Sequence, residues 1–214
     1  MGTAKAANPW LTVPLNDYEE HMSSEPVRQL DALSELFRQV LEYCRPESVA
    51  ILGVAGGNGL EQINPAMTRR VRGIDLNPDY LEAARERFGS LPGLELCCVN
   101  LAEQDTELPP VQLVHAALIF EHAGMERCLR NALVMVAAGG SLSVVLQLPS
   151  SAQEEGIGLK SLSSMQTLRQ NFRLIEPAQF REQVEGSGFH LQQEVQQPLA
   201  SGKSFWMGIF GRRL

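Results

Sequence analysis

The chain has 214 residues, of which 44% are hydrophobic and 20% charged, a globular composition that excludes a disordered or fibrous protein. A chain of this length buries roughly 70% of its extended surface around one core, so we expect one structural domain that needs no disulfide or structural metal. The formal net charge of −7 comes from 18 basic and 25 acidic residues. It would repel a phosphate backbone, so we predict no nucleic-acid partner.

The cysteines and apolar runs exclude further classes. The four cysteines include no C-x-x-C pair, so we predict no metal site. The longest apolar runs are much shorter than the roughly 20 residues that span a bilayer, so we predict no membrane association. The opening sequence MGTAKAANPW lacks the apolar stretch of a secretory signal, and we therefore expect a cytoplasmic protein.

The first strong pattern, residues 24–45, predicts an amphipathic helix. Ser24 is a suitable N-cap and Pro26 suits the first helical turn. The apolar residues at helical spacing are Val27, Leu30, Leu33, Phe37, Val40 and Leu41. We expect residues 1–45 to form a lid segment and this first helix, ahead of a main domain of residues 46–214.

Short apolar runs alternate with helix-like segments through the middle of the chain. The runs typical of strands buried on both faces are residues 48–54, 71–76, 94–100, 112–120 and 141–148. Helical segments are predicted from Leu60 onward, from Asn77 to Phe88, and from Met125 to Val136, the last stopped by Gly139 and Gly140. This alternation predicts an α/β protein with a doubly wound, mostly parallel sheet and helices on both faces.

The pattern changes after Pro149. Residues 150–165 are polar and contain glycine, which predicts a loop, and Pro177 to Glu185 predict a short helix. Two closing strands, residues 189–199 and 203–211, follow one another through a tight connection. They predict an antiparallel C-terminal hairpin that completes a sheet of seven strands.

A glycine-rich segment and an acid carry the first chemical signal. Glycines directly after a buried strand, in Ile51–Glu61, allow a sharp turn and a close approach of backbone N–H groups to a ligand. Asp75 ends the next predicted strand, where a carboxylate can accept hydrogen bonds from two ribose hydroxyls. Together these features favour a nucleoside-type cofactor. The alternative is a turn that only closes a connection and an Asp75 that only precedes a helix.

The spacing disfavours a dinucleotide, because G-x-G-x-x-G fails whether it begins at Gly53 or at Gly57. The segment instead resembles the first motif of the class I S-adenosylmethionine-dependent methyltransferases, acid-x-G-x-G-x-G, and the resemblance extends along nearly the whole chain. Gly53, Ala55 and Gly57 stand at the glycine positions, with Gly59 one step on. Ile51 replaces the usual acid, and Ala55 replaces a glycine, which preserves the turn if its φ is negative.

The resemblance implies a Rossmann-like methyltransferase fold with S-adenosylmethionine as cofactor. The cofactor-binding residues it implies are Gly53, Val54, Ala55, Gly57, Gly59, Asp75, Leu76, Asn100, Leu101 and Ala117. Asp75 would hold the ribose and Leu76 would lie under the adenine. Asn100 would face the adenine amino group, with the N–H of Leu101 reaching a ring nitrogen, or Asn100 would only satisfy its own loop. Glu61, Tyr18 or His21 would replace the missing acid near the methionine amino group.

Methyl transfer from a sulfonium depends mainly on holding the reacting atoms in line, so a general base is optional. His122 follows the fourth strand at the carboxyl edge of the sheet and is the best candidate for a base or substrate contact. Tyr18 and His21 are three residues apart and would form one face of a lid, or of a solvated helix. His115 lies in mid-strand and is expected in the core. Gln147 ends the fifth strand and is a possible substrate contact.

The acceptor is less defined than the cofactor. No Pro-Pro-aromatic motif typical of base methylation follows the fourth strand, and a small-molecule acceptor is the simplest interpretation. The alternatives are a regulatory protein that binds S-adenosylmethionine without turnover, which Ile51 favours, and a nicotinamide oxidoreductase, which the glycine spacing disfavours. The oligomeric state and the methylated atom are not predicted.

Overall fold

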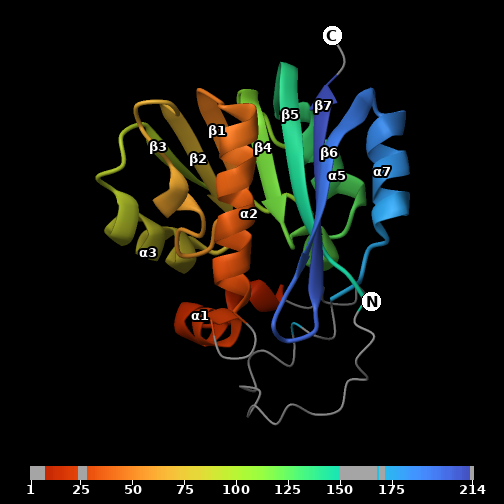
Figure 1. Ribbon diagram of the computed structural model, residues 1–214. Coiled ribbons are helices and arrows are strands. Elements are labelled where there is room, and N and C mark those ends of the chain that lie inside the picture. The colour runs from red at the N-terminus through yellow and green to blue at the C-terminus, as the bar shows by residue number, and fades with distance from the viewer. Residues whose placement is uncertain (1–7, 24–27, 150–167, 169–171, 213–214) are drawn as a thin grey trace, which may run out of the picture.

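The computed structural model describes residues 8–23, 28–149, 168 and 172–212. They contain a seven-stranded sheet in the order β3-β2-β1-β4-β5-β7-β6 (Figure 1). The strands are β1 (Ser48–Leu52), β2 (Arg70–Asp75), β3 (Leu94–Cys98), β4 (Val111–Ala117), β5 (Val136–Gln147), β6 (Phe189–Pro198) and β7 (Ser204–Arg212). Strand β7 is antiparallel to both β5 and β6. The predicted mostly parallel sheet with a C-terminal hairpin is confirmed.

Helices cover both faces of the sheet (Figure 1). The helical elements are η1 (Pro9–Leu11), α1 (Leu15–Ser23), α2 (Gln29–Cys44), η2 (Leu60–Gln62), α3 (Pro78–Phe88), α4 (Phe120–Ala123), α5 (Glu126–Val134) and α7 (Pro177–Gly186). Apolar side chains of α2 and α3 pack on one face, and those of α4, α5 and α7 pack on the other. No described helix has both the length and the apolar character needed to cross a membrane.

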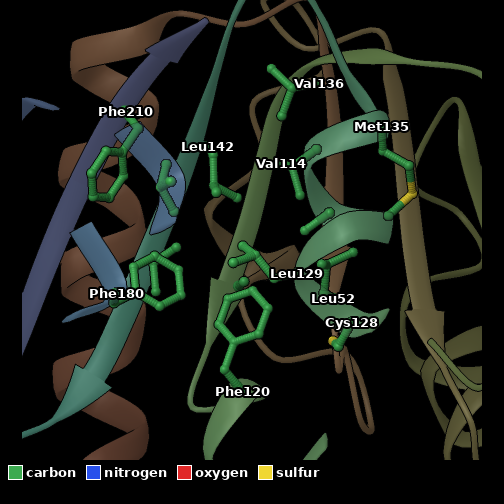
Figure 2. Packing of buried hydrophobic residues seen from close by; sticks show 14 of the residues in the cluster. Leu52, Val114, Phe120, Cys128, Leu129, Met135, Val136, Leu142, Phe180 and Phe210 are labelled. Atoms are coloured by element: carbon green, nitrogen blue, oxygen red, sulfur yellow. The ribbon is translucent and has the colours of Figure 1, made fainter. Parts of the chain in front are cut away.

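Strand β1 lies at the centre of the sheet and is buried throughout, so its side chains alternate between two cores. Val49 and Ile51 join the core under α2, whereas Ala50 and Leu52 join the core under α5 and α7. Figure 2 shows the second core, in which Phe120, Phe180 and Phe210 form a row of rings. The ring centroid of Phe180 lies 5.2 Å from that of Phe120 and 6.1 Å from that of Phe210.

Helix α3 begins where its sequence signal predicts. The side-chain oxygen of Asn77 accepts hydrogen bonds from the backbone N–H groups of Asp79 (2.9 Å) and Tyr80 (3.4 Å), and Pro78 takes the first helical position. The amide nitrogen of Asn77 also donates to the carbonyl of Trp10 (2.8 Å). One side chain therefore caps α3 and holds the N-terminal segment against it.

The predicted helix from Leu60 onward is wrong, because only the short 3-10 turn η2 forms there. Asn64 precedes Pro65, and the ring of a proline disfavours helical geometry in the residue before it. The carbonyl of Asn64 instead accepts hydrogen bonds in a turn, from Met67 (3.0 Å) and Thr68 (2.9 Å). The connection from β1 to β2 thus has one helical turn where a full helix was expected.

The predicted stop at Gly139 and Gly140 is also wrong. Helix α5 already ends at Val134, and both glycines lie inside β5. They form a bulge, since Val111 pairs with Val136 while Leu113 pairs with Ser141. Gly139 has a φ of +70°, a conformation that glycine adopts without strain.

Two predictions concern residues that the structure does not describe. The predicted N-cap Ser24 and the residues up to Val27 lie outside the described ranges, and α2 is described from Gln29. The predicted loop of residues 150–165 also lies outside them.

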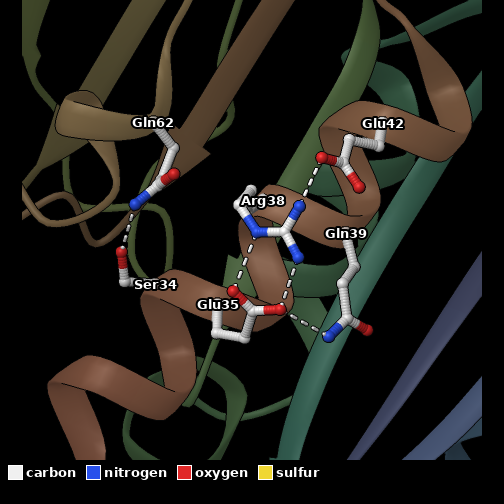
Figure 3. Close-up of polar contacts among 6 residues, drawn as sticks. All are labelled: Ser34, Glu35, Arg38, Gln39, Glu42 and Gln62. Carbon is white, nitrogen blue, oxygen red and sulfur yellow. Dashed lines mark hydrogen bonds and ion pairs between the residues drawn. The ribbon is translucent and has the colours of Figure 1, made fainter.

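The outer side of α2 carries an ion-pair network (Figure 3). The guanidinium of Arg38 contacts the carboxylates of Glu35 and Glu42, three and four residues away on the same helix. These groups are exposed, so solvent and salt screen the pairs and they contribute little to stability. Directly before Glu35 in the same helix, the hydroxyl of Ser34 accepts a hydrogen bond from the side chain of Gln62 (2.9 Å), which links α2 to η2.

We predict that Phe180→Ala lowers the free energy of unfolding by about 3–5 kcal/mol, because it empties the middle of the row of rings. Val134→Ala is the control: Val134 is 60% exposed, and its truncation should change stability by less than about 0.5 kcal/mol. Denaturant unfolding followed by circular dichroism measures both. Equal effects of the two changes would contradict this description of the core.

Candidate functional site

A cleft of about 1640 Å³ lies at the carboxyl ends of the parallel strands. It extends from Asp75, which ends β2, and Asn100, which follows β3, to Gln147, which ends β5, and Lys203, which precedes β7. Strands β1, β2 and β3 therefore provide one half of the cleft, and β4, β5 and β7 provide the other. Open α/β sheets bind ligands at this edge, where the strand order reverses.

The glycine turn after β1 forms the floor of the first half. The N–H groups of Gly53 and Val54 both donate to the carbonyl of Ile74, at 2.8 and 3.1 Å, which holds the turn against the end of β2. Gly57 has a φ of +112°, and a Cβ atom there would lie 2.3 Å from the ring of Phe88. The turn thus requires glycine at this position for both conformation and space.

Ala55 keeps its place in the turn without the negative φ on which we predicted this to depend. Its φ is +47°, in the left-handed region, and its side chain is 5% exposed. A left-handed alanine costs roughly 1–2 kcal/mol, so the rest of the turn must hold it in place. The N–H of Ala55 donates to a carboxylate oxygen of Asp75 (2.9 Å), which supplies part of that restraint.

The carboxylate of Asp75 joins the two turns of this half. One oxygen accepts from the N–H of Ala55, and the other accepts from the N–H of Asn77 (2.9 Å). Burial raises the pKa of Asp75, and these two N–H groups act against that rise. The backbone N–H of Leu76 also acts against the rise, and since a carboxylate has about four acceptor sites, Asp75 can still accept a hydrogen bond from a ligand.

Most of the residues with a predicted cofactor role line this cleft. They are Gly53, Ala55, Gly57, Gly59, Asp75, Leu76, Asn100, Leu101 and Ala117. Val54 does not line it, because its side chain is fully buried in the core under α2. Asn100 lines the cleft and its side-chain oxygen also accepts from the N–H of Ala102 (3.1 Å), so part of its polar capacity serves its own loop.

Helix α1 covers the glycine turn, and both Tyr18 and His21 line the cleft. The hydroxyl of Tyr18 accepts a hydrogen bond from the side chain of Asn58 in the turn (3.1 Å). Burial raises the pKa of Tyr18, so the phenol stays protonated at neutral pH. Glu19 forms an ion pair with Arg87 of α3, and Arg87 also donates to the carbonyl of Gly56 (3.2 Å). The N-terminal segment is thereby attached to the turn.

Glu61 and Ile51 also line the half of the cleft that contains the glycine turn. Ile51, at the usual position of the family's acid, is 4% exposed and borders the cleft. Glu61 also lines the cleft, where its carboxylate accepts a hydrogen bond from the hydroxyl of Ser34. Glu61 therefore brings a fixed carboxylate to the half of the cleft in which Ile51 brings none.

His122 lines the other half, among aromatic rings. Its ring centroid lies 4.9 Å from that of Trp10 and 5.1 Å from that of Phe172, both in edge contacts. Its Nδ1 atom has no hydrogen-bond partner among the described residues, and burial lowers its pKa to about 4. His115 is buried, as expected of a core residue, although it also borders the cleft: it stacks on Phe37 at 4.4 Å and meets Ser143 at 3.2 Å.

Several lining residues of this half have no sequence motif. They are Arg173, Ser201 and Lys203, which reach the cleft from the segment before α7 and from the β6–β7 turn. Their positions depend on how the C-terminal hairpin packs beside β5, which no short pattern encodes. Glu121 was also missed, although it directly precedes His122. Its side chain is 1% exposed and one of its oxygens has no partner among the described residues.

Sequence comparison identifies no relative. No protein-family model matches the chain. No curated protein matches it either.

Solved structures do resemble it. A magnesium protoporphyrin IX methyltransferase (ChlM) from Synechocystis PCC 6803 with bound SAM has a TM-score of 0.69 at 11% identity, over 99% of this chain and 100% of that one. The N-methyltransferase NodS from Bradyrhizobium japonicum WM9 in complex with S-adenosyl-L-homocysteine has a TM-score of 0.65 at 15% identity, over 92% and 97%. The fold is that of the class I methyltransferases. The [4+2]-cyclase SpnF shares it, with a TM-score of 0.66 at 11% identity over 86% and 82%.

We predict that Gly57→Ala destabilises the protein by about 3 kcal/mol, the sum of a left-handed alanine and an overlap with Phe88. Gly188→Ala is the control, since Gly188 also has a positive φ (+89°), but a Cβ atom there would meet no other atom within 4 Å. It should cost only about 1 kcal/mol. Chemical unfolding distinguishes them, and similar losses would show that Phe88 does not restrict the turn.

We also predict an acid-dependent loss of stability from His122. Its folded pKa of about 4 lies below the unfolded value of about 6.5, so its favourable contribution is present above pH 6.5 and lost as the pH falls toward 4. Between pH 7 and pH 5, His122→Gln should therefore lose about 2 kcal/mol less stability than the unchanged protein. Unfolding at both pH values measures this. An imidazole of His122 that titrates above pH 6 in NMR spectra would contradict the prediction.

Proposed function

We propose that this protein is an S-adenosylmethionine-dependent methyltransferase that acts on a small-molecule acceptor. The observation that carries the proposal is the pairing of the open glycine turn with the fixed carboxylate of Asp75 at the carboxyl edge of the sheet, where the strand order reverses between β1 and β4. The methyltransferase fold adds support, as do the neighbours ChlM and NodS, which contain SAM and S-adenosyl-L-homocysteine.

The residues of the first half fit such a cofactor. Gly53 is exposed in the cleft, and a Cβ atom there would meet only Ile119, so the backbone is open to close approach. Asp75 offers lone pairs to the ribose hydroxyls, and Leu76 and Leu101 offer apolar contacts to the adenine. Glu61 and Tyr18 are the polar groups available to the methionine end. When bound, the cofactor supplies a sulfonium whose methyl group is already electrophilic.

The size of the cleft favours a reaction of two bound molecules. Ligand pockets commonly measure about 300–1,000 Å³, and this cleft exceeds that range, so a nucleoside cofactor and a second small molecule fit together. Trp10, His122 and Phe172 offer ring edges and faces to an acceptor beside β4 and β5. The chain's own contribution to the reaction is to hold the two molecules in line.

His122 is suited to a neutral role in this half. With a pKa of about 4 the imidazole is unprotonated at neutral pH, so it can accept a hydrogen bond from the acceptor but is too weak a base to take its proton. Trp10 and Phe172 restrict its orientation by edge contacts. Gln147, at the end of β5, adds an amide that can position a polar group of the acceptor.

A second candidate is a protein that binds the same cofactor without methyl transfer. Ile51 favours it, because the usual acid near the methionine end is absent. The fold alone does not decide the matter, since the [4+2]-cyclase SpnF has it too. Formation of S-adenosylhomocysteine from S-adenosylmethionine in the presence of a panel of small planar acceptors would support the first candidate over the second.

The cofactor is tested by titration calorimetry with S-adenosylmethionine, S-adenosylhomocysteine and NAD. We expect the first two to bind and NAD not to bind. Asp75→Ala should weaken S-adenosylhomocysteine binding about 10- to 100-fold, the loss of charge-assisted hydrogen bonds to the ribose. Asp79→Ala, an exposed acid of α3, is the control and should leave binding unchanged. Unchanged binding by a folded Asp75→Ala protein would place the ribose elsewhere.

A further inference from the structure

Glu121 lies behind the acceptor half of the cleft and is the most completely buried acid of the described chain, at 1% exposure. It belongs to the single-turn helix α4, in which His122 and Ala123 line the cleft while Phe120 and Glu121 do not. Its side chain therefore faces away from the cleft. A carboxyl group in such a place has no contact with substrate or cofactor and needs another explanation.

Glu121 joins three segments that build the acceptor half. One carboxylate oxygen accepts a hydrogen bond from the backbone N–H of Gln147 at the end of β5 (2.9 Å). The backbone carbonyl of Glu121 accepts from the N–H of Arg173 (2.8 Å). The next residue, His122, lines the cleft together with Gln147 and Arg173. Glu121 thus links α4 to the end of β5 through its side chain and to the segment at Arg173 through its backbone.

The turn that leads into α4 requires this restraint. Leu118 follows β4 with a φ of +54°, which is strained for a branched side chain, and its N–H donates to the carbonyl of Val145 (2.9 Å). Strained backbone of this kind persists only where neighbouring contacts fix it. The hydrogen bond from Gln147 to Glu121 is a second link between the same turn and β5.

The second carboxylate oxygen of Glu121 shows that the link is costly. It is buried without a hydrogen-bond partner among the described residues. Burial raises the pKa of Glu121 to about 7, and the N–H of Gln147 acts against that rise. The charged or titratable groups on the joined segments are His122 and Arg173, and no charged side chain contributes to the shift. An apolar residue would be cheaper here for stability alone.

We propose that Glu121 is a positioning residue, whose carboxylate fixes the acceptor side of the cleft by holding α4 against the end of β5. The proposal rests on the proposed function, because it is the acceptor that this wall would orient. It assigns Glu121 an effect on His122 and Gln147 without contact with the reacting atoms. Stability and positioning should then respond in opposite directions when the carboxyl group is replaced.

The test uses the full chain labelled with 5-fluorotryptophan. The ring of Trp10 lies 4.9 Å from that of His122, so its ¹⁹F resonance reports the position of α4. A Trp206→Phe variant assigns the two signals. Glu121→Gln keeps the acceptor oxygen for Gln147, whereas Glu121→Met fills a similar volume without it. Glu126→Met, at the exposed start of α5, is the matched control.

We expect Glu121→Gln and Glu126→Met to keep the Trp10 resonance of the unchanged protein, and Glu121→Met to shift or broaden it while melting at a higher temperature at pH 8. An unchanged resonance in Glu121→Met, or an equal shift in Glu121→Gln, would overturn the proposal. S-adenosylhomocysteine binding, measured on all variants, should stay within twofold. Its absence from the unchanged protein would overturn the proposed function and leave the Trp10 result as a separate test of Glu121.

Discussion

The carboxylate of Asp75 is the constraint on which the cleft depends. It accepts hydrogen bonds from the N–H of Ala55, in the turn after β1, and from the N–H of Asn77, at the start of α3. It thereby fixes both the connection that leaves β1 and the connection that leaves β2. Ala55 could not keep its left-handed backbone without such a partner. The same side chain thus holds the turn and lines the cleft, so under the proposed function the carboxylate that would bind the cofactor is positioned by the fold itself.

The N-terminal segment extends this rigidity over the cleft. Tyr80 of α3 donates its hydroxyl hydrogen to the carbonyl of Val13 (2.9 Å), and Asn77 bonds Trp10. Arg87, at the other end of α3, pairs with Glu19 of α1. Helix α3 therefore holds the N-terminal segment at both ends. Tyr18 of α1 stays beside the glycine turn, and Trp10 of η1 stays beside His122.

The sequence was sufficient wherever the determining interaction is local. The N-cap Asn77 and the apolar runs of the strands depend on neighbours a few residues away, and the structure has them where predicted. The errors occur where distant contacts decide. The bulge at Gly139 exists because β4 pairs with β5 in two registers. The φ of Ala55 depends on Asp75, and the burial of Glu121 depends on Gln147, both of which lie about 20 or more residues away.

The two halves of the cleft differ in how their polar groups are satisfied. In the cofactor half, Asp75, Asn58 and Asn100 all have partners within the chain. In the acceptor half, Nδ1 of His122 and the hydroxyl of Ser201 are buried without partners among the described residues. Buried polar atoms without partners are costly, and a bound molecule that offers a donor or an acceptor removes that cost. The first half therefore has these polar groups satisfied within the chain, whereas the second half keeps two buried polar atoms that no described residue satisfies, and under the proposed function these are the groups that the acceptor would bond.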